Sequence, residues 1–324
     1  MTRRALQIAV TLALFAALFW FVDVRQVIDS LEAIDLTVGL PALALLFLQN
    51  ELTTRRWEIM LRAFVEPLSH FRMLRIQYMA LFAQLFLPAS VGGAAVRTGM
   101  LFRSGVRFGV AVNSVMLDRL VAMAGLILPA VIFMPTAAIS LSVGENPRVL
   151  IIAGALALAG ALVACIVALR YRPLSFWLRP LKRTPMKHLL EPLESAAPKI
   201  ADPATIFAAL AFSLGGQFIA VSAIFMLAKG SGLEVHLLDC ILIMPPVMLL
   251  SALPISIAGW GVREGAMVIA FGLLGVSREA ALLLSLQFAV LGYISAIPGA
   301  VAWFMEANRS AFRRSADCSG AKGE

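Results

Sequence analysis

Long apolar segments are the feature that most limits what this chain can fold into. Six of them have lengths of roughly 17–27 residues, enough for a helix rising 1.5 Å per residue to cross a bilayer core of about 30 Å. They lie at 5–22, 38–54, 108–134, 149–169, 204–228 and 281–305. With 60% hydrophobic and only 14% charged residues, the chain is also far more apolar than a soluble domain. The sequence therefore predicts an all-α polytopic integral membrane protein and argues against a soluble enzyme.

Two further apolar regions, 76–96 and 237–276, are interrupted by a motif that occurs twice. Residues 87–100 read LPASVGGAAVRTGM, and residues 253–266 read LPISIAGWGVREGA. Proline and glycine interrupt helices, and irregular backbone at membrane depth is tolerated only where protein buries it or it lines a wet cavity. We expect each motif to form the tip of a helical hairpin, at Pro88, Gly92, Gly93, Pro254, Gly259 and Gly261.

The distribution of positive charge predicts the topology. Loops facing the cytoplasm carry an excess of Lys and Arg, and the basic segments 55–75, 97–107 and 170–188 hold many of the 27 in this chain. These segments can all be cytoplasmic only if 76–96 enters and leaves the membrane on the same side. By the same count 237–276 forms a second re-entrant hairpin from the outside, although it is long enough to cross twice. Both termini are then cytoplasmic.

The two halves of the chain share one plan, in which two spans precede a hairpin and a third span. The first copy covers about 5–134 and the second about 149–305. An odd number of crossings separates them, so the second copy is upside down. Such inverted-topology repeats with interrupted helices are typical of transporters. We predict a single transmembrane domain at 1–305 and a polar cytoplasmic tail at 306–324.

Arg97 and Arg263 occupy matching positions in the two motifs and are candidate substrate-binding residues. An arginine at membrane depth is costly unless it is paired or hydrated. Its planar guanidinium suits bidentate contact with phosphate, and N–H groups freed at a helix start also favour an anion. In the alternative, each arginine pairs with a nearby acid, such as Glu264 beside Arg263, and pins its hairpin.

Asp118 and Arg119 are adjacent charged residues inside the third span. Neighbours on a helix point in different directions, so we expect Asp118 to pair with Arg97 and Arg119 to face a cavity or the cytoplasmic interface. Alternatively, the two anchor the end of their helix. The segment 50–62, NELTTRRWEIMLR, ends the second span, and its arginines and Trp57 predict an interfacial anchor.

The inventory of reactive residues argues against enzyme activity. The three cysteines and three histidines have no disulfide or metal-site spacing, so neither a metal nor a cofactor is expected. Catalytic triads and Gly-rich nucleotide loops are also absent from the sequence. The net charge of +8 fits contact with anionic lipid headgroups, and no nucleic-acid-binding motif is present.

The motifs RRWEIML, LPASVGGAAVRTGML, SVMLDRL and LPISIAGWGVREGAM together resemble the flippase-like family named after the transmembrane region of lysylphosphatidylglycerol synthase. The resemblance covers roughly 5–305, and GWGVREGA is its most specific part. It implies a membrane protein that translocates lipid between leaflets through a polar cavity closed by re-entrant helices. At matching positions it nominates Arg97, Asp118, Arg119, Arg263 and Glu264.

The best-known members of that family also carry a soluble aminoacyl-transferase domain. Only about 19 polar residues follow position 305, so we expect no synthesis of aminoacylated lipid. We expect instead a flippase of the bacterial inner membrane for an anionic amphiphile: a phospholipid, a polyprenyl-phosphate-linked sugar or a hopanoid-type lipid. The alternatives are a transporter of small solutes or ions, a scaffold for a separate lipid-modifying enzyme, and an intrinsic lipid enzyme.

Overall fold

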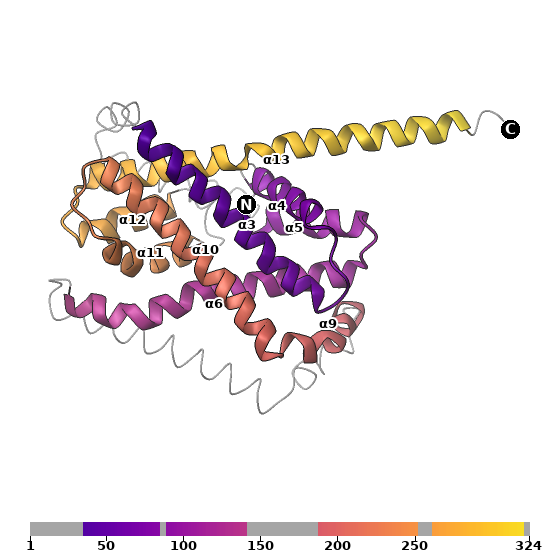
Figure 1. The fold of residues 1–324 in the computed structure, drawn as a ribbon, viewed down its shortest axis with the longest axis horizontal. Helices are drawn as coiled ribbons and strands as arrows, with labels where there is room; N and C mark the ends of the chain where they lie inside the picture. Colours follow the sequence, from indigo (N-terminus) through magenta and orange to yellow (C-terminus); the bar gives the residue numbers. More distant parts are fainter. Residues whose placement is uncertain (1–34, 85–88, 141–186, 252–260, 321–324) are drawn as a thin grey trace, which may run out of the picture.

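The computed structural model describes residues 35–84, 89–140, 187–251 and 261–320 (Figure 1). Every regular element in these ranges is an α-helix, which confirms the all-α prediction for them. The helices are α3 (Leu36–Arg62), α4 (His70–Gln84), α5 (Ala89–Arg103), α6 (Phe108–Ser140), α9 (Lys187–Ile200), α10 (Pro203–Gly230), α11 (Leu237–Ser251), α12 (Val262–Gly272) and α13 (Arg278–Gly320). The predicted spans 5–22 and 149–169 lie outside the described residues.

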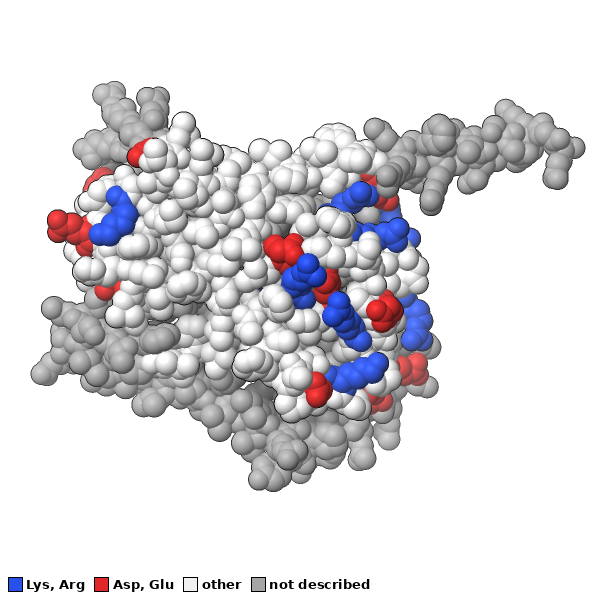
Figure 2. Space-filling model, viewed as in Figure 1, with Lys and Arg blue, Asp and Glu red and all other residues white. Residues whose placement is uncertain are grey.

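Four of these helices are long and apolar enough to cross a membrane. The segments are Leu36–Arg62, Phe108–Pro129, Pro203–Gly230 and Arg278–Glu306, and they contain or overlap the predicted spans 38–54, 108–134, 204–228 and 281–305. On the face that Figure 2 shows, a broad area without charged side chains separates a small charged group at the left end from charged groups that extend from the middle to the right. The described part of the chain is therefore that of a helical membrane protein.

The helices at the two interrupted regions are shorter and are arranged in pairs. The helices α4, α5 and α11 have 15 residues each and α12 has 11, fewer than the ~20 residues that a span needs. Helix α4 packs on α5, and α11 packs on α12. In Figure 1 the pair α4–α5 lies toward one end of the long helices and the pair α11–α12 toward the other.

Equivalent local signals begin the two helices that pack along each other, α3 and α10. Asp35 caps α3 by accepting a hydrogen bond from the Thr37 backbone N–H at 2.8 Å, and Asp202 caps α10 through the N–H of Thr205 at 3.0 Å. Such caps satisfy donors that a helix start leaves free. The hydrogen bonds from Thr37 also hold the pKa of the Asp35 carboxyl below its usual range.

The short helices α5 and α12 end in the same way. Gly105 follows α5 with a φ of 92°, and Gly275 follows α12 with a φ of 80°, a region that glycine enters without a steric penalty. The N–H of the next residue, Val106 or Val276, donates to a carbonyl five residues earlier at 3.2 Å in both cases. This hydrogen-bond pattern is that of a Schellman motif. The turn leads the chain from α5 into α6 and from α12 into α13.

The packing of the long and short helices is reciprocal. Helix α4 packs against α13, and α11 packs against α6. Helix α3 contacts both α6 and α13, and α10 contacts the same two helices. The helices α3–α6 therefore each pack on members of the set α10–α13, and those pack back on α3–α6 in the matching way. The crossing of α3 and α10 lies at the centre of this arrangement (Figure 1).

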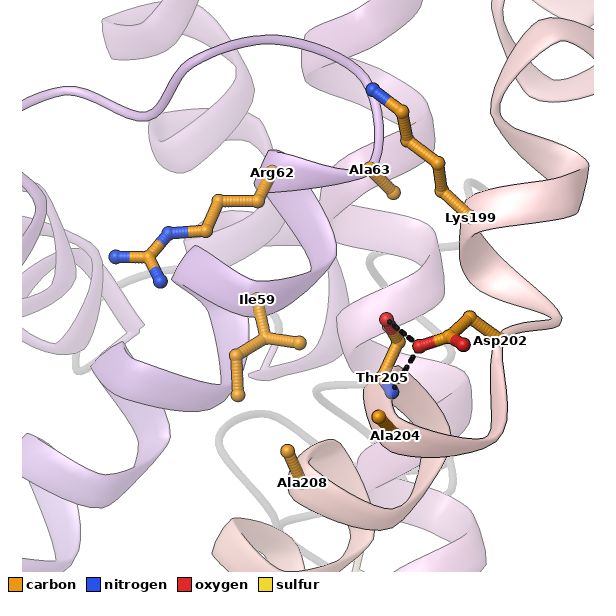
Figure 3. A pocket seen from close by; sticks show the side chains of 8 residues that line it. All are labelled: Ile59, Arg62, Ala63, Lys199, Asp202, Ala204, Thr205 and Ala208. Carbon is orange, nitrogen blue, oxygen red and sulfur yellow. Dashed lines mark hydrogen bonds between the residues drawn. The ribbon is translucent and has the colours of Figure 1, made fainter.

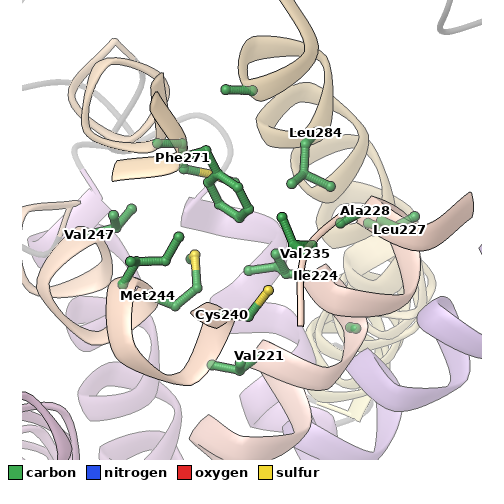
Figure 4. Close-up of a cluster of buried hydrophobic side chains, with 14 of the residues drawn as sticks. Val221, Ile224, Leu227, Ala228, Val235, Cys240, Met244, Val247, Phe271 and Leu284 are labelled. Atoms are coloured by element: carbon green, nitrogen blue, oxygen red, sulfur yellow. The ribbon is translucent and has the colours of Figure 1, made fainter. Parts of the chain in front are cut away.

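Two apolar clusters fill the interior, one at each end. The larger one joins α10, α11, α12 and α13, with Ile224, Met244, Phe271 and Leu284 among its fully covered side chains (Figure 4). The smaller one gathers residues of α3, α4, α5 and α6 around Trp57. Helix α13 continues past Glu306 to Gly320, so the segment predicted as a polar tail begins as a helix.

Candidate functional site: an arginine–aspartate cluster

Three helices bring a carboxylate between two arginines in the interior of the protein. Asp118 lies on α6, and its side chain is only 2% exposed. Its Oδ1 accepts a hydrogen bond from Arg56 Nε of α3, and its Oδ2 accepts one from Arg97 Nη1 of α5, each at 2.7 Å. We call Arg56, Arg97 and Asp118 the arginine–aspartate cluster. The predicted pairing of Asp118 with Arg97 is confirmed.

The cluster has more positive than negative charge. A guanidinium stays protonated in proteins, so Arg56 and Arg97 together oppose one carboxylate and leave one positive charge in surplus. Both arginine side chains are at least nine-tenths buried. Because burying an uncompensated charge costs several kcal/mol, the site favours an additional anionic group.

Two hydrogen-bond donors beside this surplus charge find no acceptor among the described residues. They are the Nε of Arg97 and the Nε1 of Trp57, which are both buried. The two side chains are neighbours, since the Arg97 guanidinium carbon lies 5.0 Å from the centre of the Trp57 ring. Buried donors are nearly always paired in native proteins, by protein groups, water or ligand, so these two N–H groups are available to an oxygen acceptor.

A serine of α10 connects the cluster to the fourth helix around it. Arg56 Nη1 donates to Ser213 Oγ at 3.1 Å, and Ser213 Oγ donates to the carbonyl oxygen of Val121 on α6, also at 3.1 Å. The close approach of α10 to α6 depends on Gly125, because a Cβ at that position would lie 2.2 Å from Ser213 Oγ. Arg56 is thereby fixed from both sides.

Arg119 lies next to the cluster but outside its hydrogen bonds. It is half-buried, and within the described part of the chain it makes no hydrogen bond or salt bridge. The expectation that Arg119 does not pair with Asp118 is confirmed. Its guanidinium adds a second positive charge near Arg97 and so strengthens the attraction for an anion.

The matching arginine of the second motif has a different environment. Both Nε and Nη2 of Arg263 donate to Oε1 of the adjacent Glu264. Glu264 is fully buried, and its Oε2 accepts the backbone N–H of Gly261 at 2.6 Å. Ser285 of α13 contacts the same carboxylate at 3.5 Å. The negative charge of Glu264 compensates the positive charge of Arg263, so this pair has no net charge.

The glycines predicted at the hairpin tips take different positions. Gly92 and Gly93 lie inside the first turns of α5 and are buried. A Cβ on Gly93 would lie 2.0 Å from the Gln84 side chain, so this glycine permits the close approach of α4. Gly261 precedes α12 with a φ of 80°, as a turn requires. Pro88, Pro254 and Gly259 lie outside the described residues.

Comparison with known proteins places the chain in a family. The profile described as the lysylphosphatidylglycerol synthase TM region matches residues 4–299. The chain belongs to this family. No curated protein matches it. The match spans every residue of the arginine–aspartate cluster and both motifs, so the suspected resemblance is confirmed over almost the whole chain.

In this member of the lysylphosphatidylglycerol synthase TM-region family, part of α3 differs from the sequence-based prediction. The segment 50–62 was predicted to anchor the protein at the membrane interface, but Trp57 is fully buried and Arg56 is 7% exposed. Arg56 belongs to the cluster, while Trp57 lies against Arg97 and Ser213, a residue without a sequence signal, binds Arg56. The signal for Trp57 was its place on a stripe of buried residues that runs along α3 through Ala42, Leu46, Asn50, Thr54, Trp57 and Leu61.

A cavity opens at the same end of α3 as the cluster. Its volume is about 390 Å³, and it lies between α3 and the junction of α9 with α10 (Figure 3). Arg62 and Lys199 are the positively charged side chains on its wall, while Asp202 already accepts hydrogen bonds from Thr205. The cavity wall is lined by Ile59, Arg62, Ala63, Lys199, Asp202, Ala204, Thr205 and Ala208. Ile59 is one helical turn from Arg56.

Among the described residues, no group of histidine, cysteine, aspartate and glutamate side chains is placed to hold a metal ion.

Proposed function

We propose that this protein moves a lipid with an anionic headgroup between the leaflets of the membrane, and that the headgroup phosphate binds at the arginine–aspartate cluster. One observation carries the proposal: a buried site has surplus positive charge and, at Arg97 and Trp57, two N–H donors that find no acceptor in the described part of the chain. A phosphate oxygen answers both needs, because it supplies negative charge and accepts several hydrogen bonds. Membership of a lipid-associated membrane family supports the choice of a lipid.

In our account the chain is an inverted repeat, and the reciprocal packing of the helices supports this. The register that pairs Arg97 with Arg263 also pairs His70 with His236, at the starts of α4 and α11. The Schellman motifs at Gly105 and Gly275 occupy equivalent places after α5 and α12. Transporters with such repeats rock one half against the other around a site near their centre.

We further propose that α4–α5 and α11–α12 are re-entrant hairpins that enter from opposite sides. Their helices are too short to span, and the pairs lie toward opposite ends of the long helices (Figure 1). The end that holds α4 and α5 is the more basic one, with Arg62, Arg72, Arg75, Arg103, Arg107 and Lys199. By the positive-inside rule this end is cytoplasmic, in a bacterial inner membrane, with both termini on the same side.

The two motifs then have separate roles. Arg97 binds the headgroup, and the charge-balanced pair of Arg263 and Glu264 pins the start of α12. We propose that the cavity beside Arg62 and Lys199 admits the headgroup from the cytoplasmic leaflet, since it opens one to two helical turns from Arg56. The chain itself does no chemistry on the lipid in this scheme.

Leaflet exchange in proteoliposomes tests the proposal. Vesicles would contain labelled phosphatidylglycerol or labelled phosphatidylcholine, with wild-type protein, Arg97→Gln or Arg103→Gln at equal density. Arg103 is the matched control because it is an exposed arginine of the same helix. We expect wild type and Arg103→Gln to exchange the anionic lipid faster, and Arg97→Gln to lose this preference. Exchange that equals empty vesicles for every lipid, including a polyprenyl phosphate, would contradict the proposal.

A further inference from the structure

A second group of ionisable side chains lies where the start of α4 meets a different face of α3, outside the arginine–aspartate cluster. His70, the first residue of α4, contacts two glutamates of α3 through both of its ring nitrogens. Its Nδ1 lies 2.5 Å from Glu58 Oε1, and its Nε2 lies 3.0 Å from Glu51 Oε2. We call Glu51, Glu58 and His70 the histidine–glutamate cluster. It joins the start of α4 to α3, and no part of the proposed headgroup site uses it.

The geometry of this cluster requires an additional proton. A neutral imidazole has one N–H donor and one acceptor nitrogen, whereas a carboxylate only accepts. With both glutamates ionised and the ring neutral, one nitrogen lone pair would therefore face a carboxylate oxygen at hydrogen-bond distance. Both contacts are favourable only when a second proton is present, either on the ring or on the carboxylate. The cluster is thus made or broken by one proton.

Burial makes the loss of that proton consequential. The Glu58 side chain is 5% exposed and the His70 side chain 22% exposed, so water cannot fully replace the broken contact on the Glu58 side. Arg55 lies close to both carboxylates, with Nε 2.9 Å from Glu51 and Nη1 3.7 Å from Glu58. It keeps the two glutamates near each other whether or not His70 is bound.

Among the described side chains, no charged residue of the other helices packed against α4 contacts this cluster. Among described side chains, α13 approaches α4 with Glu306, which contacts Arg75 at 4.0 Å, and its remaining charges, at the start of the helix, lie at the opposite end. The charged residues of α5 are Arg97, which is already bound in the arginine–aspartate cluster, and Arg103 in the exposed last turn. The charged partners of His70 are therefore the two glutamates of α3.

The histidine–glutamate cluster and the headgroup site are carried by the same helices. Glu58 lies on α3, as does Trp57, whose ring lies against the Arg97 guanidinium of α5, and α4 packs on α5. His70 begins the helix pair that carries Arg97. A contact that ties the start of α4 to α3 thus restrains the hairpin whose other helix binds the headgroup, and releasing it frees that hairpin to move.

We propose that Glu51, Glu58 and His70 form a proton-binding site that locks the α4–α5 hairpin to α3 when protonated and releases it when the proton leaves. Lipid exchange then rises with pH. When the proton leaves, a lone pair of the His70 ring faces a carboxylate oxygen, the contact is lost, and the hairpin is released. The second half lacks this device: His236 stands at the position equivalent to His70, but Gln217 and Ile224 stand where the first half has Glu51 and Glu58.

Nitrogen-15 NMR of the histidine rings tests the site without requiring lipid movement. The chain has three histidines, so the spectrum of His70→Gln identifies the His70 signals in full-length protein. We expect the His70 ring of wild type to pass from its two-proton form to its one-proton form as pH rises, and Glu58→Gln to shift that transition. His236→Gln is the matched control and leaves it unchanged. A His70 titration that Glu58→Gln and Glu51→Gln both leave in place would overturn the proposal.

The pH profile of leaflet exchange tests the consequence and rests on the proposed function. Wild type and His236→Gln should exchange lipid more slowly at low pH, with the slope of a single proton, and His70→Gln should exchange at a rate that no longer depends on pH. A profile of His70→Gln that follows wild type, or exchange that falls with rising pH, would contradict the lock. If NMR detects the linked proton but no lipid moves at any pH, the proposed function fails and the proton site stands.

Discussion

Replacing the shared carboxylate should destabilise the protein more than replacing either arginine. In Asp118→Asn, two buried guanidinium groups keep their charge and lose the carboxylate that they share. Removing one partner of a buried ion pair costs about 3–5 kcal/mol. In Arg97→Gln, Arg56 and Asp118 remain a neutral pair, and the loss is one charge-assisted hydrogen bond of about 1.5–3 kcal/mol.

Thermal unfolding in detergent measures this difference. At roughly 2–4 °C per kcal/mol, Asp118→Asn should unfold on the order of 10 °C below wild type and Arg97→Gln about half as far below. Phosphatidylglycerol should restore Asp118→Asn more than it stabilises wild type, since ligand binding raises stability and the variant has a greater surplus of positive charge. Glu66→Gln, at an exposed loop acid, is the control and should unfold like wild type.

The opposite order would refute the reasoning. If Arg97→Gln were less stable than Asp118→Asn, the cluster would not carry the positive surplus on which the account depends. The same conclusion would follow if phosphatidylcholine restored Asp118→Asn as well as phosphatidylglycerol does.

Three further substitutions test individual contacts. Gly299→Ala places a Cβ 2.0 Å from a backbone oxygen of α4, so it should cost about 1–3 kcal/mol or more through overpacking, whereas Gly292→Ala, with open space around it, should unfold like wild type; equal melting temperatures would contradict this packing. Ser213→Ala removes the hydroxyl that holds Arg56 and should cost about 1–3 kcal/mol and weaken stabilisation by phosphatidylglycerol, and a variant that melts and binds like wild type would count against it. Glu264→Gln should lower the melting temperature but preserve the preference for anionic lipid in leaflet exchange, because we assign it to pinning α12; loss of that preference would place it in the headgroup site.

The long helices could be predicted because hydropathy sums over many residues. An apolar stretch the length of α10 or α13 has no other stable place than a membrane or a buried core. The short helices were recognisable from the proline and glycine that interrupt them. The pairing of Arg97 with Asp118 was predictable as well, since a buried arginine needs an acid and acids are rare inside these apolar segments.

The rest of the cluster depends on how the helices are rotated against each other. Arg56 and Arg55 are adjacent, yet only Arg56 faces the interior, and the sequence does not say which side of α3 meets α6. Ser213 lies 157 residues from the arginine that it binds, a separation at which spacing along the chain carries no information.

The two motifs already differ in sequence at the position after the arginine. Thr98 follows Arg97, whereas Glu264 follows Arg263, so only the second arginine has a carboxylate next to it. His70 had no signal in the sequence beyond a spacing that argues against a metal site. Its role depends on the meeting of α3 and α4, which brings residues 12 and 19 positions away onto one ring.

Native mass spectrometry of bound lipid tests the central claim most directly. The protein would be released from mixed micelles of phosphatidylglycerol and phosphatidylcholine, and lipid retention compared between wild type, Arg97→Gln and the control Arg103→Gln. We predict that wild type and the control retain phosphatidylglycerol selectively and that Arg97→Gln does not. Equal retention of phosphatidylglycerol by all three proteins would show that the arginine–aspartate cluster does not bind the headgroup.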